Sequence, residues 1–129
     1  SIMASELRVN TLKDAAGNNS IATSFVANGS AKAWINFNGT GTVAIRDSFS
    51  VSSISDAGTG NYDINLASAM ANANYANSGM SADLAAGAYV CYESPSTIAT
   101  TAIGIYIFTS GSAIVDNNLI AVNFDGDLA

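Results

Sequence analysis

The feature that most constrains the fold of this chain is the alternation of apolar and polar side chains in residues 31–38. Successive side chains of a strand point to opposite faces, so this pattern predicts a strand with one buried face. Only Trp34, the sole tryptophan, interrupts the polar parity. A Gly-containing stretch follows at 38–41, and the apolar parity resumes at 43–45. Residues 31–49 therefore predict a β-hairpin.

Similar patterns recur along the rest of the chain, with turn-forming residues between them. The predicted strands are 32–38, 42–47, 49–54, 61–66, one beginning near 74, 88–93, 100–108 and 119–124. Short strands at roughly ten-residue spacing are typical of a sandwich, and the lack of intervening helices excludes parallel βαβ order. We therefore expect an all-β protein. It would be an antiparallel β-sandwich or jelly-roll-like domain over 31–129, preceded by a short N-terminal arm or stem over 1–30.

Four local features of the sequence predict details of the fold. Asp47 falls on the apolar parity, which predicts a β-bulge or bend there. Residues 67–76 are rich in both Ala and Asn, and we expect a turn and a new strand rather than a helix. Residues 88–93 are apolar on both parities and predict a strand buried on both faces. Residues 81–87 fit one capped helical turn.

The first 30 residues predict an element that depends on partners. They contain few apolar side chains, and 13–19 is rich in turn-forming residues, so this segment would fray alone. The rest of the chain carries apolar residues on both faces of several strands, with only 14 charged residues in the whole protein (ten acidic and four basic). Monomers rarely expose large apolar patches, so we expect more than one copy to assemble.

Composition and charge exclude several classes of function. The net charge is −6, with four basic residues, which is incompatible with the basic surface that nucleic acids or anionic membranes require. The longest apolar run, 102–108, is too short to cross a bilayer. Cys91 lies in an apolar run and predicts a buried, unreactive thiol.

We expect no catalysis, cofactor or metal. The chain has no His, and no nucleophile stands in a recognisable setting. Asp47 and Glu93 are the acids nearest to strand interiors, and they are the best candidates for the remote alternative of a glycan-cleaving pair. The acidic stretches 56–63 and 125–127 lack the ligand spacing of a calcium loop and fit solvated acids better.

Aromatic residues supply the remaining candidate site. Tyrosine and tryptophan combine an apolar body with a polar tip, which suits both protein interfaces and sugar stacking. The candidate interface or ligand-stacking aromatics are Trp34, Tyr75, Tyr92 and Tyr106. For each of them, a place in the core or in a subunit interface is the leading interpretation.

Three linked blocks resemble a known family. Residues 31–41 (AKAWINFNGTG), 45–54 (IRDSFSVSSI) and 56–66 (DAGTGNYDINL) are similar to a domain of bacteriophage tail-fibre and related virion proteins. The similarity continues to 73–75. Residues 6–18 (ELRVNTLKDAAGN) resemble short repeats of phage fibre stems.

The resemblance implies a non-enzymatic virion structural protein. It would be a trimeric tail-fibre or fibre-knob component on the phage surface or tail, assembled in the host cytoplasm and contacting the host surface. The implied partners are copies of itself, other virion proteins, and a glycan or protein of the host cell. Residues 67–80 and 93–100 are the expected distal, host-contacting loops. The alternatives are a capsid or tail decoration protein without a receptor role and, remotely, a glycan-binding or glycan-cleaving domain.

Overall fold

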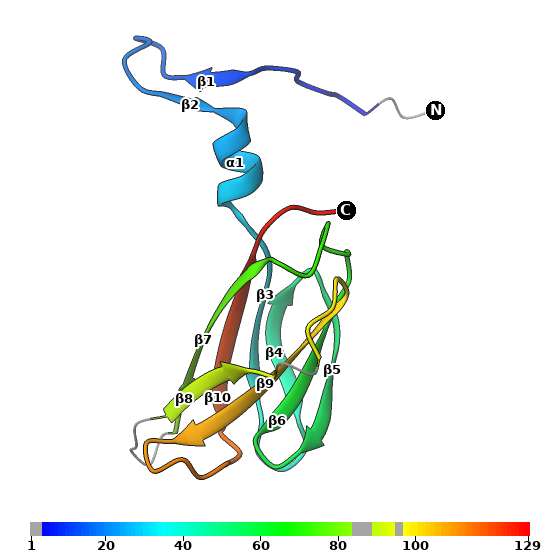
Figure 1. Cartoon of the computed structure of the whole chain (residues 1–129). Helices are drawn as coiled ribbons and strands as arrows, with labels where there is room; N and C mark the ends of the chain where they lie inside the picture. The colour runs from blue at the N-terminus through cyan, green and yellow to red at the C-terminus, as the bar shows by residue number, and fades with distance from the viewer. Residues whose placement is uncertain (1–3, 84–88, 95–96) are drawn as a thin grey trace. The chain divides into compact units, whose positions relative to one another are not determined.

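The structure is a computed structural model that describes residues 4–83, 89–94 and 97–129 (Figure 1). Its internal contacts divide the chain into two units, Ser1–Ser30 and Ala31–Ala129. This boundary coincides with the one between the expected arm and the expected sandwich.

The second unit is a sandwich of two four-stranded sheets (Figure 1). In the first sheet the strand order is β4-β3-β10-β7, and in the second it is β5-β6-β9-β8. The strands are β3 (Ala31–Asn38), β4 (Ala44–Phe49), β5 (Val51–Gly58), β6 (Asn61–Leu66), β7 (Ala76–Ala82), β8 (Tyr89–Glu93), β9 (Ala102–Thr109) and β10 (Leu119–Asp125). All neighbouring pairs are antiparallel. The predicted antiparallel β-sandwich is confirmed.

The core lies between the inner faces of the central strands. Its buried apolar residues are Ala33, Ile35, Phe37, Tyr62, Ile64, Leu66, Met70, Ile103, Ile105, Ile107, Ile120, Val122 and Phe124. Most of them alternate along β3, β6, β9 and β10, as the period-two pattern predicted. Fully burying one large apolar side chain contributes about 1.5–3 kcal/mol, so this set is the main source of stability.

The β3–β4 hairpin contains the predicted bulge, and the bulge changes the face of the sheet on which Phe49 lies. Asn36 pairs with Asp47 but Phe37 pairs with Ile45, so Arg46 is the extra residue. Its guanidinium donates a hydrogen bond to the carbonyl of Phe37 at 2.8 Å. Because the extra residue reverses the parity, Phe49 lies on the outer face and is 56% exposed, although in the sequence it shares the parity of Ile45.

Three other expectations concern strand β8, strand β7 and residues 81–87. Strand β8 is an edge strand and not buried on both faces, since Val90 is 40% and Tyr92 is 53% exposed. Residues 67–76 form no helix, as expected, and β7 begins at Ala76, so residues 76–80 are strand and not loop. The predicted helical turn at 81–87 begins inside β7, and residues 84–88 lie outside the described residues.

The sandwich has two poles. At the entry pole, Ala31 at the start of β3 pairs with Asp125 at the end of β10. Met70 forms a bridge with Leu128 there, and its amide donates to the carbonyl of Thr100 at 2.8 Å. Residues 67–75 and 97–100, from the two loops that were expected to be distal, therefore lie at the entry pole and not at the opposite one. The opposite pole is formed by the connections 39–43, 59–60 and 110–118.

Hydrogen bonds around one buried tyrosine hold the opposite pole together. The hydroxyl of Tyr62 donates to the carbonyl of Gly39 at 2.7 Å and also lies 3.0 Å from Oδ1 of Asp116. The amide of Gly60 donates to the same carboxylate at 2.7 Å. A Cβ at Gly39 would lie 2.4 Å from the Tyr62 hydroxyl, so the close approach requires glycine. Three connections that are distant in sequence are thus fixed to one another.

The N-terminal unit has regular structure but no core. It consists of β1 (Thr11–Lys13), β2 (Ser20–Ala22) and helix α1 (Thr23–Gly29), which the sequence did not predict. The carboxylate of Asp14 accepts hydrogen bonds from the backbone of Asn18 and from the side chain of Asn19, which closes the β1–β2 turn. Among the described residues of this unit none is buried.

Candidate functional site

The four aromatic candidates occupy three separate places. Trp34 lies on the outer face of the first sheet, because Ala33 and Ile35 on either side of it are buried. Tyr92 and Tyr106 pair across β8 and β9 in the second sheet. Tyr75 lies just before β7 at the entry pole. The candidates therefore do not form one site.

Tyr75 has a structural role. Its ring packs edge-on against Phe124, with ring centroids 6.2 Å apart. Its hydroxyl donates to the carbonyl of Ala99 at 2.8 Å. Burial, with the nearby charge of Glu93 as a smaller cause, raises the pKa of the Tyr75 phenol. The side chain fastens residues 67–75 to the segment before β9, so it does not offer a ring to a ligand.

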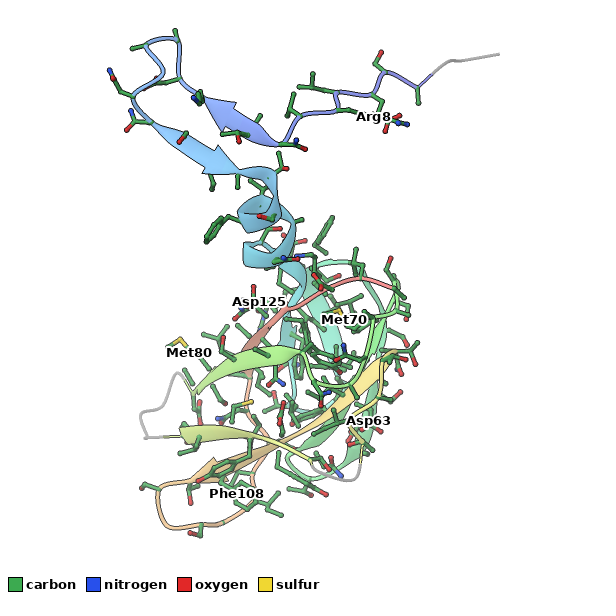
Figure 2. All side chains as sticks on the ribbon, turned by 45° about the horizontal axis from the view of Figure 1, so that its top comes forward. Arg8, Asp63, Met70, Met80, Phe108 and Asp125 are labelled. Carbon is green, nitrogen blue, oxygen red and sulfur yellow. The ribbon has the colours of Figure 1, made fainter. Side chains whose placement is uncertain are left out.

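The second sheet carries a cluster of three aromatic rings on β8 and β9. Tyr92 packs against Phe108 with ring centroids 5.4 Å apart, and Tyr106 lies 6.1 Å from the same ring. Phe108 is thus the centre of the cluster, although it was not among the candidates (Figure 2). Phe108 and Tyr106 are two residues apart in β9, so their side chains lie on the same face of the sheet. Its central role depends on the pairing of β8 with β9.

The first sheet brings Trp34 into a broader surface that the sequence did not reveal. Strand register places two rows of side chains across its outer face. One row is Phe49, Trp34, Asn123 and Ser78, and the other is Asp47, Asn36, Ala121 and Met80. Trp34 is 38% exposed and Met80 is 80% exposed. Met80 is labelled in Figure 2, where it projects from β7 at the side of the sandwich.

Between Trp34 and Met80 lies a groove of about 490 Å³, which we call the Trp34 groove. Its residues are Trp34, Ile35, Asn36, Ser78, Gly79, Met80, Ala121, Val122 and Asn123. The small side chain of Ala121 stands between Asn36 and Met80 and keeps the floor low. No lining residue is charged. The groove joins three strands that are distant in sequence, so only the register could reveal it.

Two hydrogen bonds order the polar side of the Trp34 groove. The hydroxyl of Ser78 donates to Oδ1 of Asn123 at 2.6 Å. The amide of Asn123 donates in turn to Oδ2 of Asp125 at 2.8 Å. The side chain of Asn123 is therefore held in one orientation beside Trp34, between the hydroxyl of Ser78 and the carboxylate of Asp125. A ligand in the groove would meet an aromatic ring and oriented amide and hydroxyl groups.

The acids considered from the sequence lie apart. Asp47 belongs to β4 and Glu93 to β8, and these edge strands lie at opposite edges of the sandwich. Glu93 accepts a hydrogen bond from the side chain of Asn77. In the 56–63 stretch, Asp56 accepts a bond from the amide of Gly58 at 3.0 Å. Across the described ranges, no group of three or more His, Cys, Asp or Glu side chains is arranged to hold a metal ion.

Cys91 faces the gap between the two sheets at their β7 and β8 edges. A Cβ at Gly79 would lie 2.7 Å from its Sγ, so glycine makes room for the sulfur. Burial raises the pKa of the Cys91 thiol to about 11. Thiolate, not thiol, is the nucleophile, so the environment lowers the reactivity of this group at neutral pH.

We predict that Cys91 is alkylated slowly in the folded protein. Relative to an ordinary thiol pKa of 9.0, a pKa of about 11 lowers the thiolate fraction at pH 8 about 100-fold. Mass spectrometry after iodoacetamide treatment should show this difference between folded and urea-unfolded protein, with the folded rate still rising at pH 10. Equal rates in the two states would contradict the assignment.

The same shift makes the fold less stable in alkali. The folded protein holds the thiol proton more tightly than the unfolded chain, so the contribution is complete below about pH 9 and declines as pH rises towards 11. Tyr62 acts in the same direction, because burial raises the pKa of its phenol as well. Urea unfolding midpoints should therefore fall above about pH 9.

Comparisons of the chain with protein-family models, with curated proteins and with solved structures found no match. Within the part of the chain that the structure describes, no helix has the length and apolar character needed to span a membrane.

Proposed function

We propose that this protein is a non-enzymatic structural component of a bacteriophage virion. In this proposal the N-terminal unit assembles copies of the chain into a trimeric fibre or knob, and the sandwich is presented towards the host surface. The observation that carries the assembly role is that none of residues 4–30, the described part of the N-terminal unit, is buried. The likeness to fibre and fibre-stem sequences supplies the virion context and the three-fold symmetry.

The N-terminal unit has too little local stability to fold alone. Helix α1 has seven residues and no side-chain cap at its start, whereas isolated helices shorter than about 12–15 residues are marginal in water. Strands β1 and β2 have three residues each, and a lone two-stranded hairpin is also marginal. A partner surface must therefore supply the burial that this unit lacks.

The apolar side chains of this unit are available for such a contact. Six of them are exposed by 38% or more: Leu7, Val9, Leu12, Ile21, Phe25 and Val26. Phe25 on α1 is 71% exposed. Burying apolar area contributes about 25 cal/mol per Å², so packing these side chains against those of other copies stabilises the unit.

Charge favours the N-terminal unit over the sandwich as the self-contact. Residues 1–30 contain two acidic and two basic residues and are neutral. Residues 31–129 contain eight acidic and two basic residues, a net charge of −6. Copies that meet through the neutral units avoid the like-charge repulsion that broad contact between sandwiches would cause.

Contact with the host distinguishes this proposal from its alternative, a decoration protein without a receptor role. Phage adsorption to its host should fall when the cells are first saturated with the purified protein, because both would occupy the same receptors. Plaque counts on unadsorbed phage measure the effect, and labelled protein should coat the cells. A heat-unfolded sample is the control. Unchanged adsorption together with uncoated cells would favour the decoration protein.

A further inference from the structure

We propose that the Trp34 groove binds a neutral oligosaccharide. This inference rests on the host contact in the proposed function, and it names the place and the class of ligand. The groove is the position where the sandwich combines an exposed tryptophan, a small-residue floor and oriented polar side chains.

The shape of the groove suits a ligand of a few sugar units. Its volume of about 490 Å³ lies within the range of roughly 300–1,000 Å³ that is typical of small-molecule sites. The indole ring of Trp34 offers a flat apolar body to the C–H face of a sugar ring. Met80 forms the other side, and its flexible side chain adapts to irregular surfaces.

The polar side chains of the groove match sugar hydroxyls. Asn36, Ser78 and Asn123 each carry groups that donate and groups that accept hydrogen bonds. Asn123 is held in place through Ser78 and Asp125, so its orientation is fixed before a ligand arrives. Central strands β3 and β10 carry the ring and two of these amides, which gives the site a rigid base.

Charge selects a neutral sugar over an acidic one. No residue of the lining is charged, but charged groups stand next to it. Asp47 pairs with Asn36 on the same face, Asp125 accepts a hydrogen bond from Asn123, and the guanidinium of Arg46 lies 3.4 Å from Oδ1 of Asn36. The sandwich as a whole carries a net charge of −6. A carboxylated sugar would be repelled by this net charge, which the Arg46 guanidinium offsets only in part because it also donates to the carbonyl of Phe37.

An extended apolar peptide fits the groove less well. The backbones of β3 and β10 are already paired on both sides, so a peptide gains no strand-to-strand hydrogen bonds there. An apolar side chain over Asn36 would bury the NH2 of its side-chain amide, of which only the oxygen is engaged, by Arg46, and this costs about 1–3 kcal/mol. A sugar hydroxyl can accept a hydrogen bond from that NH2.

The sole tryptophan makes the test direct, because its fluorescence reports the groove and no other place in the chain. The intact protein is titrated with neutral oligomers of glucose, galactose and N-acetylglucosamine, and with a sialylated oligosaccharide as the charged probe. At least one neutral oligomer should shift the emission in a saturable way below about 10 mM, and the sialylated probe should not.

Two variants and a matched control locate the binding. Ala121→Leu fills the floor from a position on the outer face and should weaken binding about tenfold or more, and Trp34→Ala should abolish it by calorimetry. Tyr92→Ser removes an exposed aromatic ring from the second sheet and should leave affinity unchanged. All three variants should keep the circular dichroism spectrum of the original protein.

The outcomes separate this inference from the proposed function. Absence of any saturable shift overturns the inference, and it does so even if the protein still competes with phage adsorption. A lower assembled mass for Trp34→Ala or Ala121→Leu would assign the face to a contact between copies and would also overturn it. Saccharide binding without any effect on adsorption would support the groove and count against the host-contact role.

Discussion

Removal of residues 1–30 is expected to convert the assembled protein into monomers that keep the sandwich fold. Every buried apolar residue of the described chain lies between Ala33 and Phe124, so the truncated chain retains its whole core. The exposed apolar side chains of the N-terminal unit are lost with it. Light scattering should give about three times the chain mass of 13.1 kDa for the full protein and about one chain mass after truncation.

A point variant tests the same contact with less disturbance. Phe25→Ser removes the aromatic side chain of α1, which is 71% exposed, and should lower the assembled mass at micromolar concentration. Tyr92→Ser, an exposed aromatic on the sandwich, is the matched control and should not. A stable monomer formed by the unmodified full-length chain would contradict both the trimer and the stem assignment.

Phe37→Ala is expected to lower the free energy of unfolding of the sandwich by about 3–5 kcal/mol. Phe37 has no exposed surface, and its ring lies edge-on to Tyr62 with centroids 5.2 Å apart. Its removal leaves a cavity between the sheets and loosens the tyrosine that holds the opposite pole together. Urea unfolding followed by circular dichroism at fixed protein concentration measures the loss.

Phe49→Ala is the matched control, since it makes the same chemical change one strand away. Phe49 is 56% exposed on the outer face, so the expected change is within about 0.5 kcal/mol in the truncated sandwich, where assembly adds nothing. Equal losses for the two variants would show that the bulge in β4 does not turn Phe49 outward.

The sequence was informative where burial follows a local period. Along β3 and β10 every second residue is buried, so alternation alone predicted the strands and their inner faces. It was misleading at β8, where apolar residues on both parities suggested an interior strand. Sheet order, which depends on long-range pairing, places β8 at an edge, where Val90 and Tyr92 are exposed.

The candidate site was predictable only in part. Trp34 was identified because it breaks the polar parity of its strand. Its neighbours Met80 and Ala121 were not, because they join it through the pairing of β10 with β3 and β7, across more than forty residues of chain. Helix α1 was missed for a different reason, since seven residues without a side-chain cap carry almost no local signal.

The pairing of Ala31 with Asp125 fixes the pole at which the chain enters the sandwich. The first strand of the sandwich therefore begins, and its last strand ends, at the same pole. In an array held by its N-terminal units, the connections 39–43 and 110–118 would lie at the pole of each sandwich opposite to the one at which the chain enters. Insertions into these connections, which Tyr62 anchors, would then lengthen the sandwich at that pole, whereas insertions into residues 67–75 would lengthen it at the entry pole.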